Sequence, residues 1–126
     1  MPLFEAMATV CAPSVALEVL IGISFVESGV RPLNFRDGAQ VVEIRTVGEG
    51  VSAILGAGER GRELGIGLMG LTPARLQTIG YSIADGFDPC LAMKASALLM
   101  DRSRAAPDRK HFAPLVLDRV RSEERV

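Results

Sequence analysis

Prolines and glycines interrupt this chain at short intervals, so its helices must be short. Pro13 and Ser14 form a helix-start signal, and Gly29 followed by Pro32 forms a stop. Between these signals the apolar residues recur every three to four positions, the spacing of a helix with one buried face. The row that we expect to be buried consists of Val15, Val19, Ile23 and Val26, with Leu20 beside it.

Two later helices are predicted by start signals of a common kind. Thr72 can cap a helix that begins with Pro73 and ends at Gly80, and the Asp-Pro pair at 88–89 begins another over CLAMKASALLMDRS. A weaker, glycine-containing helix is predicted over residues 46–58. In the helix that begins at 88–89, we expect one face to carry Leu91, Ala95, Leu98 and Leu99. In the helix over residues 46–58, we expect Val51, Ile54 and Leu55 to face inward.

The remaining segments predict a minor β element and an extension. An Asp37-Gly38 pair between two short alternating apolar stretches predicts a small hairpin or an irregular loop. The GERGREL segment at 58–64 is typical of a polar turn, and residues 65–70 form a glycine-rich apolar segment. Residues 105–126 carry mixed charges, and we expect a charged C-terminal extension there, helical from Leu115. Together these elements predict an α+β fold that is mostly α.

The composition excludes several classes of function. The chain has 126 residues, of which 48% are hydrophobic, enough for a single core. A net charge of −1 and a pI near 5.8 argue against a nucleic-acid surface. The longest apolar stretch, 15–26, is interrupted by Glu18 and is shorter than the roughly 20 residues that a membrane span needs. No signal peptide is visible, because the first ten residues lack Lys and Arg.

The cysteines and the histidine do not form a metal-binding pattern. Cys11 and Cys90 have no neighbouring histidine, since the only one in the chain is His111. The cysteines are therefore either two buried thiols or one disulfide. The glycines of GIGLMG do not predict a dinucleotide site, because no Val-rich strand precedes them and no acidic residue follows at the required distance. We expect no metal and no cofactor.

Glu27 stands at an unusual place for a carboxylate. It lies in the last turn of the predicted first helix, where the helix dipole is negative and an acid is not favoured. Helix carbonyls and apolar walls would disfavour its ionised form, which would suit the group to donate a proton near neutrality. The simpler alternative is a solvated residue at a helix end. The tripeptide Glu-Ser-Gly alone favours that alternative.

The order of several short motifs resembles one enzyme family. These motifs are CAPSV at 11–15, VESGVRP at 26–32, GLMGLT at 67–72 and IGYSIADGFDPC at 79–90, followed by a helix rich in small residues. In sequence and spacing they resemble the lytic transglycosylases of bacterial type IV secretion systems, which belong to the lysozyme-like superfamily. The resemblance covers residues 8–104 and implies a lysozyme-like domain there.

The resemblance implies an activity, a place of action and site residues. Glu27 would be the only catalytic carboxyl, first donating a proton to the bond between N-acetylmuramic acid and N-acetylglucosamine and then accepting one from the muramyl 6-hydroxyl to form a 1,6-anhydro ring. Ser28 would orient this carboxyl. The remaining expected contacts with the glycan strand are Leu68, Met69, Gly70 and Thr72. The protein would act in the periplasm, where secretion-system subunits are further candidate partners and a Cys11–Cys90 bridge could form.

The chain departs from the family pattern at three positions. Gly70 and Thr72 stand where the family has Gln and Asn, and Ala92 stands where it tends to have Asn. We expect Gly70→Gln to raise activity if the backbone there accepts a side chain. The losses leave two alternatives to a fully active enzyme: weak turnover, or a catalytically reduced binding and assembly module. A cytoplasmic helical domain without cell-wall chemistry is a third possibility, favoured by the missing signal sequence.

Overall fold

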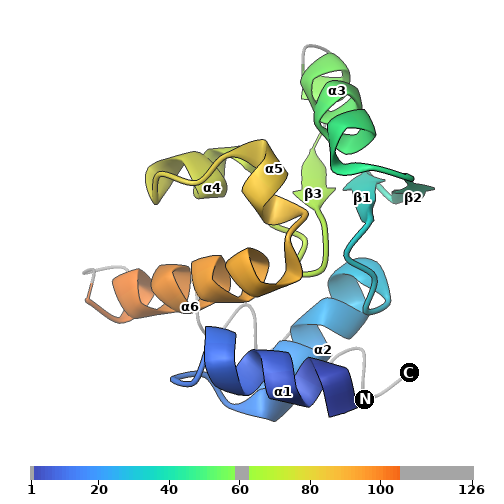
Figure 1. Ribbon diagram of the computed structural model, residues 1–126. Helices are drawn as coiled ribbons and strands as arrows, with labels where there is room; N and C mark the ends of the chain where they lie inside the picture. Colours follow the sequence, from blue (N-terminus) through green and yellow to red (C-terminus); the bar gives the residue numbers. More distant parts are fainter. Residues whose placement is uncertain (1, 59–62, 106–126) are drawn as a thin grey trace.

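A computed structural model describes residues 2–58 and 63–105 of the chain. The described residues form a mostly helical α+β fold, which confirms the predicted fold class. Figure 1 shows α1 and α2 below α6, with the small sheet beyond the C-terminal end of α2 and with α3 above that sheet. The elements in chain order are α1 (Pro2–Cys11), α2 (Leu17–Ser28), β1 (Asn34–Asp37), β2 (Gln40–Glu43), α3 (Val47–Gly58), β3 (Leu64–Ile66), α4 (Pro73–Thr78), α5 (Ile83–Gly86) and α6 (Pro89–Ala105).

Helix α1 is an element that the sequence analysis did not predict. It packs against α6 and α2, and its buried residues Phe4, Ala8 and Cys11 follow the three- to four-residue spacing of one helix face. Cys11 at its end is joined to Cys90 in the first turn of α6, with 5.3 Å between their Cα atoms. The structure therefore contains the disulfide, one of the two states that the sequence left open.

Helix α2 begins later than predicted, at Leu17 rather than near Ser14. It ends as predicted at Gly29, whose left-handed conformation (φ 64°) lets its N–H bond to the Phe25 carbonyl oxygen. The predicted apolar row was only partly right, because Val15, Val19, Ile23 and Val26 are half-buried. The fully buried face instead carries Leu20 and Ser24, followed by Glu27 and Ser28.

The predicted hairpin is present and belongs to a larger sheet. β1 pairs antiparallel with β2 around the Asp37-Gly38 turn, with Phe35 opposite Val42. The third strand, β3, pairs antiparallel with the other edge of β1 and places Ile66 opposite Phe35. The strand order within the described residues is therefore β2-β1-β3. β3 was missed because it is three residues long and contains a glycine, so it carries no alternation to detect.

The later helices begin where the sequence predicts. The Thr72 hydroxyl accepts a hydrogen bond from the Arg75 amide at the start of α4, and the Asp88 carboxylate accepts one from the Leu91 amide at the start of α6. A short helix that we did not predict, α5, is capped by Ser82 and Asp85 in a reciprocal pair of hydrogen bonds.

Two inward positions were predicted wrongly. Leu55 in α3 is 57% exposed and Leu98 in α6 is 43% exposed. Their helices turn other residues inward, because the core is built from the rows that contain Ile54 and Met93. The buried positions of α6 other than Met93 and Met100 carry small side chains: Ala92, Ala95, Ser96, Ala97 and Ser103.

Some predictions fall outside the described residues. The expected C-terminal extension, which includes His111, lies outside them except for Ala105, the last residue of α6. The middle of the expected polar turn, 59–62, also lies outside them. None of the helices in the described ranges has both the length and the apolar character needed to cross a membrane.

Candidate functional site

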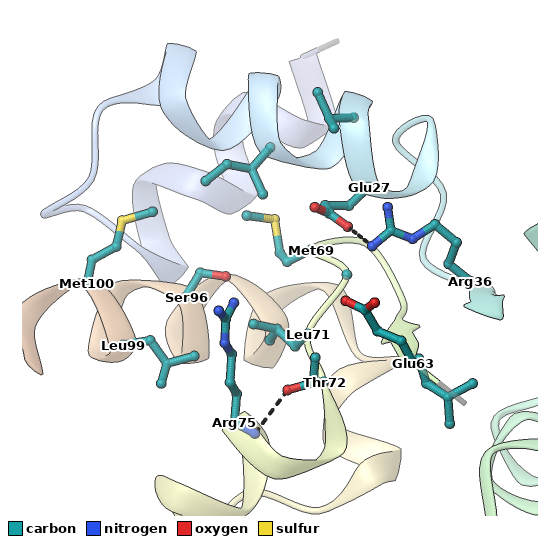
Figure 2. Close-up of a pocket in the computed structure, with 14 residues that line it drawn as sticks. Glu27, Arg36, Glu63, Met69, Leu71, Thr72, Arg75, Ser96, Leu99 and Met100 are labelled. Atoms are coloured by element: carbon teal, nitrogen blue, oxygen red, sulfur yellow. Dashed lines mark hydrogen bonds and ion pairs between the residues drawn. The ribbon is translucent and has the colours of Figure 1, made fainter. Parts of the chain in front are cut away.

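A cleft that is open in part to solvent runs between α2, the sheet, α4 and α6. Figure 2 shows its walls, to which α2 contributes Glu27, β1 contributes Arg36, and the turn after β3 contributes Met69 and Thr72. The motifs at 26–32 and 67–72, which lie far apart in the sequence, therefore meet in one cleft.

Glu27 lies in the last turn of α2, and its side chain is only 6% exposed. One of its carboxylate oxygens, Oε2, is 2.7 Å from Nη2 of Arg36, which reaches it from β1. The sequence analysis expected helix carbonyls and apolar walls around this carboxyl. Because the side chain is buried, the alternative of a solvated helix-end residue is wrong. The expected surroundings were incomplete, because they did not include the Arg36 guanidinium in direct contact with the carboxylate.

Gly70, in the turn after β3, packs directly against the Glu27 side chain. Its φ is +62°, and a Cβ built on it would lie 2.6 Å from the Glu27 Cβ and 2.8 Å from its Cδ. Any side chain at position 70 would therefore combine an unfavourable backbone conformation with a steric clash. The condition attached to Gly70→Gln is therefore not met, and glutamine would displace the carboxyl that it is meant to assist.

Ser28 does not orient the Glu27 carboxyl as expected. Its buried hydroxyl donates to the carbonyl oxygen of Leu68 at 2.7 Å and lies 2.9 Å from the carbonyl oxygen of Ser24. The same hydroxyl accepts a hydrogen bond from the Arg31 amide. These contacts tie the end of α2 to the turn after β3. Ser28 therefore holds two walls of the cleft together through the backbone, and it does not itself line the cleft.

Asn34 is a structural residue of the site that the sequence analysis missed. It is 2% exposed, and its side-chain amide donates to the Ser28 carbonyl oxygen at 3.0 Å. Its own carbonyl oxygen accepts a bond from the Gly67 amide at 2.9 Å. Asn34 thus joins α2, β1 and the turn after β3. An asparagine in a short strand-like stretch carries no sequence signal for such a role.

The other predicted contacts divide into two groups. Met69 and Thr72 line the cleft, and Figure 2 shows the Met69 side chain between Glu27 and Ser96. The Thr72 hydroxyl also caps α4. Leu68 is buried in the hydrophobic core and does not line the cleft. Leu68 therefore supports the turn from behind, while Thr72 and the buried Met69 form part of the cleft wall.

Three charged residues of the cleft were not predicted: Arg36, Glu63 and Arg75. Figure 2 shows the Glu63 carboxylate on the same side of the cleft as Arg36, with the Arg75 side chain beside Leu71 and Ser96. Glu63 had been assigned to a polar turn, and Arg36 directly precedes the Asp37-Gly38 turn. Among the described residues, the cleft thus combines two guanidinium groups with two carboxylates.

The site has the chemistry of proton transfer and of polar ligand binding. A largely buried carboxylate faces a cleft and can exchange a proton with a bound group, while arginines beside it can bind acidic groups. Within residues 2–58 and 63–105, no group of three or more His, Cys, Asp and Glu side chains is arranged to hold a metal ion.

Comparisons of the chain with family models, with curated proteins and with solved structures found no match.

Proposed function

We propose that this chain is a peptidoglycan lytic transglycosylase similar to those of type IV secretion systems, with Glu27 as its general acid and base. It would cleave the β-1,4 bond between N-acetylmuramic acid and N-acetylglucosamine and open the cell wall locally for a secretion or conjugation apparatus. The observation that carries the proposal is the position of Glu27: a carboxyl that is almost buried, yet stands in the wall of a cleft next to the turn formed by GLMGLT.

The reaction needs only one carboxyl group. Protonated Glu27 donates its proton to the glycosidic oxygen as the bond to the muramyl anomeric carbon breaks. The resulting carboxylate then takes the proton of the muramyl 6-hydroxyl, whose oxygen attacks that carbon and closes the 1,6-anhydro ring. The glycan supplies its own nucleophile, so the second carboxylate of most glycosidases is not required.

The disulfide supports an extracytoplasmic place of action. Disulfides persist in oxidising compartments such as the bacterial periplasm and are rare in the cytosol. The Cys11–Cys90 bond links α1 to α6, two helices that pack against each other. A periplasmic protein would meet glycan strands directly, and secretion-system subunits are further candidate partners.

A catalytically reduced module that binds peptidoglycan or assembles with the secretion system is the second candidate. It is favoured by the geometry at Gly70, which leaves no space for the Gln side chain of the family pattern.

Digestion of purified peptidoglycan with mass analysis of the products tests the proposal. A transglycosylase releases muropeptides that end in 1,6-anhydromuramic acid. Products with ordinary reducing ends would instead indicate hydrolysis, for which Glu63 would be the candidate second carboxylate in the cleft. If the folded, oxidised protein releases no product but sediments with the insoluble wall, the second candidate replaces the first.

A further inference from the structure

We propose that Ser96 is a specificity residue of the cleft: its hydroxyl donates a hydrogen bond to the acetamido group of an N-acetylated sugar, whose methyl group packs against apolar side chains nearby. The ligand class is an N-acetylated saccharide, and its identity as a peptidoglycan strand rests on the proposed function. Ser96 lies in α6, and Figure 2 shows Met69 between it and Glu27. Ser96 therefore binds the ligand and takes no part in the proton transfer.

The hydroxyl of Ser96 is unusual because nothing in the described part of the chain bonds to it. Ser96 is only 6% exposed, and it has no hydrogen bond with any described residue. A serine inside a helix commonly donates to the carbonyl oxygen one turn before it. Ser28 makes that contact in α2, where its hydroxyl lies 2.9 Å from the Ser24 carbonyl oxygen. Ser96 does not make it in α6.

The hydroxyl of Ser96 has a cost that the described fold does not offset. The neighbouring buried positions carry Ala95 and Ala97, and alanine has the highest helix propensity of all residues. A serine between them has a lower propensity, and its hydroxyl loses most of its contact with water without gaining an internal bond. Native structures contain few such groups, and each needs a physical explanation. The position of Ser96 in a cleft wall indicates that its partner comes from a bound ligand.

The Ser96 side chain faces the cleft. Figure 2 shows it pointing into the cleft toward Met69, with the Arg75 guanidinium beside it. Two apolar residues that also line the cleft, Leu99 and Met100, follow Ser96 by three and four positions, so they lie on the same face of α6. Leu71 lies near them in Figure 2. This end of the cleft therefore offers hydrogen-bond donors among apolar side chains.

An acetamido group matches this arrangement. Its carbonyl oxygen accepts a hydrogen bond from a hydroxyl, and its methyl group is stabilised by contact with apolar side chains. That carbonyl oxygen lies two bonds further from the sugar ring than a hydroxyl oxygen on the same carbon, so it reaches a donor in the wall that the hydroxyl does not. Ser96 should therefore favour N-acetylated sugars over unmodified ones. Both groups are uncharged, so the preference does not depend on the ionisation of the cleft.

Titration of the full oxidised chain with two neutral trisaccharides, followed by NMR, tests the role of Ser96. The probes are tri-N-acetylchitotriose and cellotriose, which share a β-1,4-linked backbone and differ only in the group at C2, acetamido in the first and hydroxyl in the second. We expect the acetamido probe to bind at least about fivefold more tightly, from one hydrogen bond and one buried methyl group. Mass spectrometry checks that the probes stay intact.

Two serine-to-alanine variants separate ligand binding from structure. Ser96→Ala should weaken binding of tri-N-acetylchitotriose by about two- to tenfold, the effect of one neutral hydrogen bond, and leave binding of cellotriose unchanged. It should not lower the midpoint of thermal unfolding, because no internal bond is lost and alanine has the higher helix propensity. Ser52→Ala in α3 is the matched control. Ser52 is exposed and does not line the cleft, so this variant should bind both probes as the parent does.

Several results would overturn this role of Ser96. These are absence of binding of tri-N-acetylchitotriose at millimolar concentration, equal affinities for the two probes, an unchanged preference in Ser96→Ala, or a fall in its unfolding midpoint, which would show that the hydroxyl is structural. Neither probe carries a peptide, so a preference that depends on Ser96 assigns its hydroxyl to the sugar acetamido group and not to an alanyl amide of the stem peptide.

The binding assay needs no lysis of cell wall. If peptidoglycan is not cleaved but the preference that depends on Ser96 is found, the proposed reaction fails and the role of Ser96 stands. Lysis without that preference would reverse this outcome.

Discussion

Gly70→Ala should destabilise the protein far more than an ordinary glycine substitution. At φ +62° an alanine is strained by about 1–2 kcal/mol, the cost of a left-handed conformation for a residue with a Cβ. The new methyl would also lie 2.6–2.8 Å from Glu27 side-chain carbons, and overpacking of this kind costs about 1–3 kcal/mol. The free energy of unfolding should therefore fall by about 2–5 kcal/mol, measured by guanidinium denaturation of the oxidised protein.

Gly29→Ala is the matched control. Gly29 has a φ of +64°, but no atom lies within 4 Å of a Cβ built there. This variant should show the backbone cost alone, about 1–2 kcal/mol. If Gly70→Ala costs no more than Gly29→Ala, then the 67–72 turn does not press against Glu27, and the geometry on which the proposed role of Glu27 rests is wrong.

Three further changes test the fold around the site. Thiol titration of the denatured, unreduced protein should find no free cysteine, and Cys11→Ser with Cys90→Ser should lower the free energy of unfolding by about 4–5 kcal/mol, given a sequence separation of 79. Asn34→Ala should cost about 1–3 kcal/mol in the same denaturation assay, because the buried Ser28 carbonyl loses its donor. Met93→Ala should cost about 2–5 kcal/mol, whereas Leu98→Ala at the exposed position should cost well under half as much.

Local capping signals in the sequence predicted the starts of α4 and α6, but not that of α2, which begins at Leu17. Thr72 with Pro73 and Asp88 with Pro89 begin α4 and α6, because capping depends on residues within one turn. α1 was missed because its signal is only the spacing of its few buried residues, without a capping residue that marks its start. The inward faces at Leu55 and Leu98 were wrong because large apolar side chains were assumed to be buried, whereas α3 buries Ile54 and Ala57 and α6 buries mainly alanines and serines.

The candidate site was predicted in part. The resemblance placed Glu27 and the 67–72 turn in one site, and the structure brings them together at the wall of the cleft. Arg36 was not found, because its contact with Glu27 joins β1 to the end of α2, and no local sequence pattern indicates which side chains of two separate elements meet. Gly65 and Gly70 leave space for the two side chains of this ion pair, because a Cβ at either position would crowd one of them. From the sequence alone, these glycines could equally have served the close packing of helices.

The lysis of peptidoglycan by Glu27→Gln tests the central claim most directly. Glutamine keeps the size of the side chain and can still bond to Arg36 through its carbonyl oxygen, but it cannot supply the proton. The release of anhydromuropeptides by the folded variant, followed by mass analysis, should fall by about 10²- to 10⁴-fold relative to the parent. Undiminished release by a variant with an unchanged unfolding curve would contradict the assignment of Glu27 as the acid and base of this protein.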